Sequence, residues 1–158
     1  MQLVGRIGAA LAGVVGLAVL FAWYANGAAL AGPLSTKPTA ALGLVLLSIA
    51  LVASDRPRVA AVLGVAVLAI GGLSLAEYAL GTSLGVATLL PGIELNGDAL
   101  RMAPSTAFSL FVLGGSVLSS RLARSTLALV LAVVALCVSQ IAILGYVYGV
   151  SSLYTVGG

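Results

Sequence analysis

Apolar residues fall into five long runs along this chain, and proline, glycine or charged residues bound each run. The runs cover residues 7–30, 38–53, 59–80, 104–120 and 126–148. A helix that crosses the hydrocarbon core of a bilayer needs about 20 predominantly apolar residues. The first, third and fifth runs reach this length. The pattern therefore predicts an all-α fold, a polytopic transmembrane helix bundle with five spans, in which residues 1–158 form a single domain.

The second and fourth runs are short, with 16 and 17 residues. Two interpretations stay open for them: spans in a locally thinned bilayer, or re-entrant hairpins. Pro38 and Pro104 open these runs, and proline is favoured in the first turn of a helix, where its missing N–H is not needed. We therefore expect helices that start at these two prolines, with tight turns at 54–58 and 121–125 and an outer loop over 81–103.

Composition supports a membrane environment. Of the 158 residues, 61% are hydrophobic and 7% are charged, and the mean hydropathy is +1.24. A soluble domain carries about 25% charged residues, and a chain of this size has too much surface to cover with so few. The lipid bilayer is therefore the expected surrounding of most of the surface.

Charge and residue usage exclude several functions. The seven basic residues are scattered and form no patch of the kind that binds nucleic acid, so we expect no nucleic-acid partner. The chain has no histidine and one cysteine, Cys137, which excludes a CxxC motif and removes the commonest metal ligand. No nucleophile–base pair or carboxylate dyad can be assembled. We therefore expect a chain that is not an enzyme, with no catalytic residue, metal site or cofactor.

Basic residues are distributed unevenly between the two sides of the predicted bundle. One side carries Arg6, Arg56, Arg58, Arg121 and Arg124, and the other carries Lys37 and Arg101. Because cytoplasmic loops are enriched in Lys and Arg, we expect a bacterial inner-membrane protein with a cytoplasmic N-terminus and a C-terminus outside. A cleaved signal peptide is the alternative for the first run, since Ala29-Leu30-Ala31 before Gly32 resembles a small-residue cleavage site, but the run is long for one.

The chain contains an internal repeat. The odd-numbered runs end in Tyr-x-x-Gly at 24–27, 78–81 and 146–149, and the even-numbered runs open with Pro-Thr-Ala or Pro-Ser-Thr-Ala. A unit of two helices keeps its orientation in each copy, so we expect parallel two-helix repeats. The tyrosine would lie at the membrane interface, and the glycine would end the helix in a left-handed conformation. The pattern also predicts a sixth span beyond the C-terminus.

Two segments resemble a known family. They are Met-Ala-Pro-Ser-Thr-Ala at 102–107, before an apolar helix, and Gly-Tyr-Val-Tyr-Gly at 145–149, before Leu153-Tyr154. Both are similar to the N-terminal membrane region of bacterial sensor histidine kinases, diguanylate cyclases and related multidomain signalling proteins. The resemblance implies a membrane sensor, or input module, for signal transduction in a two-component or related system, with cytoplasmic PAS, kinase or cyclase modules as output. Residues 37–40 lack one residue of the motif.

Four residues are candidates for a ligand or proton site: Glu77, Tyr78, Gln140 and Tyr146. Glu77 is the only ionisable residue inside a predicted span, and such carboxylates often mark ion or proton pathways. It also lies one turn from the outer end of its helix, so a solvated interfacial role stays open. Gln140 is either a hydrogen-bonding contact between helices or part of a site. The tyrosines either line an outer pocket or form an aromatic belt. The ligand is unknown.

Small residues at four-residue spacing mark expected helix-packing positions. The glycines among them are Gly13, Gly64, Gly115, Gly145 and Gly149. Small side chains let helix backbones approach closely in a membrane, either within the chain or between the copies of a homodimer.

Three functions stay open on the sequence. The first is the sensor or input module, acting as a homodimer. The second is a non-catalytic structural or accessory subunit of a larger membrane complex. The third is a small transporter or proton path built on Glu77, which needs more charge inside the membrane than the spans contain.

Overall fold

The computed structural model describes residues 2–26, 36–86, 101–122 and 124–149, and all regular structure in them is helical. Five long helices are present in this part: α1 (Gln2–Asn26), α2 (Pro38–Val52), α3 (Pro57–Leu80), α5 (Pro104–Arg121) and α6 (Ser125–Tyr148). A short 3-10 turn, η2 (Ala53–Asp55), joins α2 to α3. The all-α prediction is confirmed. The helices follow the five apolar runs, except that α1 already begins at Gln2.

Prolines set the starts of three helices. Pro38, Pro57 and Pro104 are the first residues of α2, α3 and α5. The proline ring disfavours helical geometry in the preceding residue. Accordingly, Lys37 and Ala103 are extended, with ψ of 146° and 144°. The predicted helix starts at Pro38 and Pro104 are confirmed.

Two glycines end helices as the repeat predicts. Gly81 follows α3 with φ of 64°, and Gly149 follows α6 with φ of 66°. Both values lie in the left-handed region, which glycine enters without steric penalty and which commonly terminates helices. The third glycine of the motif, Gly27, lies outside the described residues.

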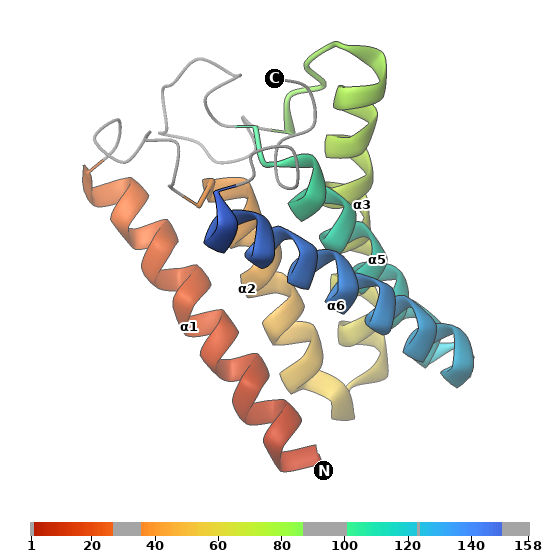
Figure 1. Cartoon of the computed structure of the whole chain (residues 1–158). Coiled ribbons are helices and arrows are strands. Elements are labelled where there is room, and N and C mark those ends of the chain that lie inside the picture. The colour runs from red at the N-terminus through yellow and green to blue at the C-terminus, as the bar shows by residue number, and fades with distance from the viewer. Residues whose placement is uncertain (1, 27–35, 87–100, 123, 150–158) are drawn as a thin grey trace.

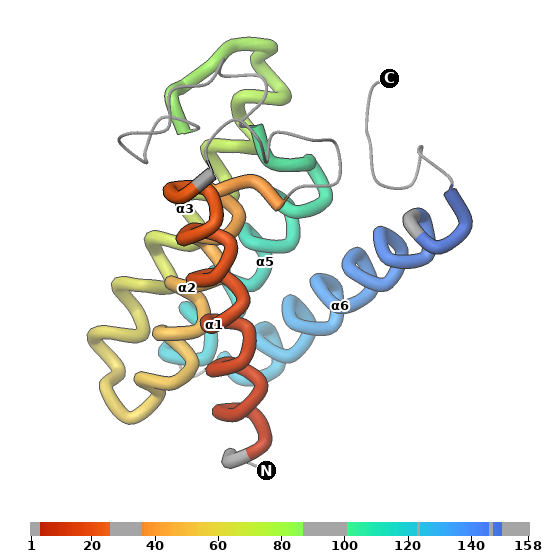
Figure 2. The backbone as a smooth tube through the Cα atoms, turned by 90° about the vertical axis from the view of Figure 1, so that its left-hand side faces the viewer, coloured from red at the N-terminus to blue at the C-terminus, as the bar shows by residue number. Residues whose placement is uncertain are grey.

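Each helix packs on the next helix along the chain, and α6 crosses in front of the bundle in Figure 1. Helix α1 packs on α2, α2 packs on α3 and α5, and α3 packs on α5. Helix α6 packs on α5 and leans away from the other four helices (Figure 2). The α3–α5 pair therefore forms the centre of the bundle, and α1 and α6 form its two edges.

Backbone-to-backbone contact joins α3 to α5. A Cβ atom on Gly71 of α3 would meet the backbone nitrogen of Phe111, and it would lie 2.7 Å from the carbonyl oxygen of Ala107. In the same way, a Cβ atom on Gly114 of α5 would lie 2.5 Å from the backbone nitrogen of Leu68. The two helices run antiparallel, and glycine is required at both contacts because no side chain fits there.

Among the described residues, four helices are long and apolar enough to cross a membrane; the segments are Val4–Ala25, Pro38–Asp55, Pro57–Leu80 and Ser125–Gly145. Helix α5 does not reach the same apolarity because it carries six hydroxyl side chains. Large apolar side chains cover the outside of the bundle; Phe21, for example, is 76% exposed. Such a surface is unfavourable in water and favourable in lipid.

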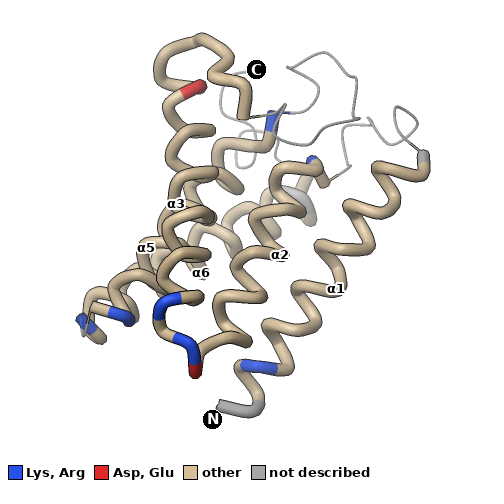
Figure 3. The backbone as a smooth tube through the Cα atoms, turned by 180° about the vertical axis from the view of Figure 1, so that it is seen from behind, with Lys and Arg blue, Asp and Glu red and all other residues tan. Residues whose placement is uncertain are grey.

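Charged residues gather at the two ends of the bundle and are missing from the described middle (Figure 3). Arg6 and Arg121 lie at the end that holds the N-terminus, where they contact Asp55 and Ser54 of the η2 turn. Glu77 and Arg101 lie at the opposite end. The arginine-rich end predicted from the sequence is therefore one physical surface, built from α1, η2 and α5.

Candidate functional site

Glu77 is the most buried charged side chain of the described residues, with 2% exposure. It lies on the last turn of α3, one turn before the chain reverses at Gly81. Its Oε1 atom accepts hydrogen bonds from the backbone N–H of Leu84 at 2.7 Å and of Val86 at 3.2 Å. A buried carboxylate needs such partners. Glu77 therefore holds the segment after Gly81 against the end of its own helix.

Arg101 completes the cluster around Glu77. Its Nε atom lies 4.0 Å from Oε2 of Glu77, and its Nη2 atom donates a 2.9 Å hydrogen bond to the carbonyl oxygen of Thr82. Its guanidinium carbon lies 5.7 Å from the centre of the Tyr78 ring, within the range of a cation–π contact. Arg101 thus links the residues before α5 to the end of α3.

Tyr78 adds a second link across the same hairpin. Its hydroxyl group donates a 2.7 Å hydrogen bond to the carbonyl oxygen of Met102, two residues before Pro104. We refer to Glu77, Tyr78, Arg101 and Met102 as the Glu77 cluster. Sequence reasoning selected Glu77 and Tyr78 but missed Arg101. The available signal was that Arg101 lies three residues before α5 and Glu77 lies three residues before the end of α3.

A related contact closes the first hairpin. The indole nitrogen of Trp23, near the end of α1, donates a 2.8 Å hydrogen bond to the carbonyl oxygen of Thr36, two residues before Pro38. Trp23 is 2% exposed. In both hairpins an aromatic donor at the end of the long helix therefore holds the carbonyl that lies two residues before the proline. The two donors do not occupy the same position of the Tyr-x-x-Gly motif, because Trp23 aligns with Glu77 and Tyr24 aligns with Tyr78.

Gln140 does not join the Glu77 cluster. It is exposed on α6 and makes no hydrogen bond to any residue that the structure describes. The hydroxyl group of its neighbour Ser139 donates to the carbonyl oxygen of Ala135 in the same helix, at 2.9 Å. Tyr146 belongs to α6, but its side chain lies outside what the structure describes. The structure thus brings together two of the four candidate residues.

A small groove of about 200 Å³ lies between the N-terminal half of α5 and the C-terminal half of α6. The side chains that line it include four hydroxyl groups; the residues are Ser105, Thr106, Ser109, Val138, Ser139, Ala142 and Ile143. The groove lies on the packed side of α6, away from the outward side that carries Gln140.

The predicted packing glycines have different surroundings. Gly13 faces Ser48 of α2, and Gly64 faces Val117 of α5. A Cβ atom on Gly115 would make only ordinary contacts, the nearest with a methyl carbon of Leu131 at 3.5 Å. Gly145 is buried on α6.

A Cβ atom built on Gly149 would have no neighbour within 4 Å among the described residues, so Gly149 is not a packing position there. Its left-handed conformation ends α6 instead. The closest glycine contacts with backbone atoms are those of Gly71 and Gly114, which sequence reasoning did not select. Each lies in a Gly-Gly pair, and that pairing was the available signal.

The arginine-rich end contains its own connected set of residues. Arg6 of α1 pairs with Asp55 at 2.5 Å and also contacts the Ser54 hydroxyl group at 3.3 Å. Arg121 of α5 donates a 3.0 Å hydrogen bond to the carbonyl oxygen of Ser54. The η2 turn is therefore held from both sides, by Arg6 of α1 and by Arg121 of α5.

The described residues contain no group of three or more side chains able to hold a metal ion. No known protein family, no curated protein and no solved structure matches the chain. Functional inference therefore depends on the geometry above and on the sequence motifs.

Proposed function

We propose that this chain is an integral membrane input module of a bacterial signal-transduction protein, which passes a conformational change through its helix bundle to a cytoplasmic output domain. The observation that carries the proposal is the α3–α5 pair. It connects the Glu77 cluster at one end with the Arg121–Ser54 contact at the other. The sequence motifs at 102–107 and 145–149 point to the same class of protein.

Rigid coupling between α3 and α5 gives this module its mechanism. At Gly71 and at Gly114 the two backbones touch with no side chain between them. Packed backbones have no soft rotamers that can absorb a small displacement, so such elements move as units. A ligand that displaces Arg101 or Tyr78 at the outer end would therefore shift the whole pair and change how Arg121 holds η2.

The proposed topology has five spans and a cytoplasmic arginine-rich end in the bacterial inner membrane. Helix α5 lies antiparallel along α3, so it crosses the bilayer wherever α3 does. Helix α5 packs on three other helices, α2, α3 and α6, so its hydroxyl groups can face these helices rather than lipid. The positive-inside bias gives the orientation. The similar contacts of Trp23 and Tyr78 with the carbonyl two residues before the next proline support the parallel two-helix repeat, although the two donors are adjacent rather than identical positions of the motif.

The outward side of α6 is the proposed surface for self-association. Val133, Cys137, Gln140, Leu144 and Val147 recur at helical spacing along it, and all are exposed. An amide surrounded by lipid is unfavourable without a hydrogen-bonding partner. The glutamine amide is both donor and acceptor, so Gln140 of two copies can pair with each other. The same surface favours the second candidate function, an accessory subunit that packs on another membrane protein.

Spin labelling tests transmission through the bundle. In a Cys137→Ser background, a label at Arg58→Cys reports the start of α3 at the arginine-rich end. We expect Glu77→Ala to change the mobility of this label, and we expect Ser83→Ala, a neighbouring exposed position, to leave it unchanged. If Glu77→Ala loosens residues 82–86 but the label at position 58 keeps its spectrum, transmission is contradicted and the accessory-subunit function is favoured.

A further inference from the structure

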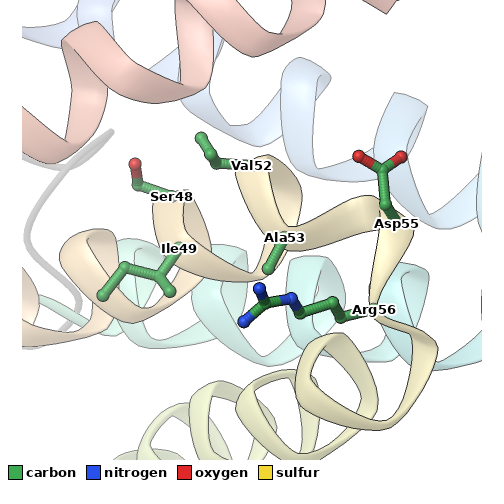
Figure 4. Close-up of a pocket in the computed structure, with 6 residues that line it drawn as sticks. All are labelled: Ser48, Ile49, Val52, Ala53, Asp55 and Arg56. Carbon is green, nitrogen blue, oxygen red and sulfur yellow. The ribbon is translucent and has the colours of Figure 1, made fainter.

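A groove beside the η2 turn opens on the arginine-rich end of the bundle (Figure 4). Its volume is about 330 Å³, and it is lined by Ser48, Ile49, Val52, Ala53, Asp55 and Arg56. Ile49 and Val52 are 47% and 44% exposed, so the groove is open to the outside of the protein. Its lining combines apolar side chains from the last turns of α2 with charged residues at the turn.

The charges at this groove are not balanced by the residues that the structure describes. Asp55 forms an ion pair with Arg6, and Asp55 is the only carboxylate at this end among the described residues. Arg56 has no ion-pair partner among the residues that the structure describes. Its side chain runs back beneath Ala53 towards Ile49, and the Asp55 carboxylate lies on the other side of the turn (Figure 4). The groove therefore presents one uncompensated guanidinium group next to an apolar wall.

We propose that this groove binds one anionic phospholipid, with the phosphate on Arg56 and an acyl chain along Ile49 and Val52. Arg56 follows the η2 turn, where the chain reaches the membrane interface, and Ile49 lies three residues before the end of α2, about 5 Å further into the bundle at 1.5 Å of rise per residue. A phospholipid has the same order of groups, with a charged phosphate at the interface and hydrocarbon below it.

Charge complementarity selects an anionic lipid over a neutral one. Arg121 and Arg124 flank the same end, and anionic lipids are enriched at the cytoplasmic leaflet. Arginine also pairs with phosphate through two parallel hydrogen bonds. The Ser48 hydroxyl group is already engaged with the carbonyl oxygen of Ala9, so Arg56 is the group left to hold the phosphate.

The site has a structural consequence for the bundle. Its walls belong to α2 and η2, and η2 is the turn that Arg6 and Arg121 hold from either side. A lipid bound here would therefore stabilise the turn that connects α1, α2, α3 and α5 at this end.

Native mass spectrometry of the purified full chain tests the proposal. The probes are phosphatidylglycerol and phosphatidylcholine with identical acyl chains, added to the delipidated protein in detergent. We expect phosphatidylglycerol to be retained preferentially, and we expect Arg56→Gln to lower its retention by about fivefold, the factor that one arginine contributes near an anionic surface. Arg56→Lys should retain part of the binding.

Arg58→Gln is the matched control, because Arg58 lies two residues further on and does not line the groove. It should bind like the wild type. Equal losses in Arg56→Gln and Arg58→Gln would show general attraction to the basic end and overturn the site. Equal retention of phosphatidylcholine would overturn the headgroup assignment. Competition by inorganic phosphate at the same concentration as the lipid would overturn the role of the acyl chain.

Discussion

The hydroxyl group of Ser48 on α2 donates a 2.6 Å hydrogen bond to the carbonyl oxygen of Ala9 on α1. The bond is buried, and it lies where Gly13 leaves space for the serine side chain, since a Cβ atom there would meet the Ser48 hydroxyl oxygen. The packing position Gly13, found by spacing in the sequence, therefore contacts α2 within one chain, and Ala9 lies at the same contact.

Replacing Ser48 by alanine removes this contact between helices. We expect Ser48→Ala to destabilise the bundle by about 0.6 to 2 kcal/mol, the range for side-chain hydrogen bonds between membrane helices. Steric trapping or thermal unfolding in detergent, followed by circular dichroism, measures the change. Ser139→Ala is the control, because Ser139 bonds only within its own helix and should change stability less. Equal effects would contradict the interhelical role.

The contact of Gly71 with Phe111 predicts a position that does not accept even a methyl group. We expect Gly71→Ala to lower the free energy of unfolding by about 1 to 3 kcal/mol, because α3 and α5 must separate. Gly72→Ala is the matched control on the next residue, where a Cβ atom meets only the Phe111 ring at 3.3 Å. The same unfolding experiment applies. A Gly71→Ala protein as stable as the Gly72→Ala protein would refute the backbone contact.

The hydrogen bonds from Leu84 and Val86 to Glu77 predict how the segment after Gly81 responds to substitution. We expect Glu77→Ala to increase amide hydrogen exchange at Leu84 and Val86, because their acceptor is lost. Glu77→Gln keeps an acceptor oxygen and should remain near the wild-type rate. Hydrogen exchange with mass spectrometry of the 82–86 segment distinguishes the two. Equal rates in all three proteins would show that Glu77 does not hold this segment.

The outward side of α6 predicts a cross-linked dimer. Cys137 lies one turn before Gln140 on the same side of α6 and is exposed. In liposomes treated with copper phenanthroline, we expect a Cys137–Cys137 disulfide between two copies. Gln140→Leu should weaken the association by about 1 kcal/mol, the contribution of one interhelical hydrogen bond. Ser139→Ala should leave the cross-linked fraction unchanged. Cross-linking that does not depend on Gln140 would exclude the amide pairing.

Helix starts and ends were predictable from the sequence because they depend on local chemistry. Proline fixes the geometry at Pro38 and Pro104, and glycine permits the left-handed conformation at Gly81. The contacts that join helices were not predictable in the same way. Arg6 and Asp55 are 49 residues apart. Hydropathy carries no information on which helices face each other when all of them are apolar on every side.

The candidate site was predictable only in part, for the same reason. Glu77 stands out as a charge within an apolar run, whatever the fold. Its partners depend on how the chain returns after Gly81 and where Arg101 lies when α5 packs on α3. Gln140 also stands out in the sequence. Its exposure follows from the angle at which α6 leaves α5, which no local pattern sets (Figure 2).

Trp23 gives the native protein a built-in optical reporter. It is the only tryptophan of the chain, and its indole is buried and bonded to Thr36 at the closed end of the α1–α2 hairpin. If α1 swings away from α2, this indole loses its bond and meets a new surrounding, so its emission maximum shifts. Movement of α1 can therefore be followed by steady-state fluorescence on unlabelled protein.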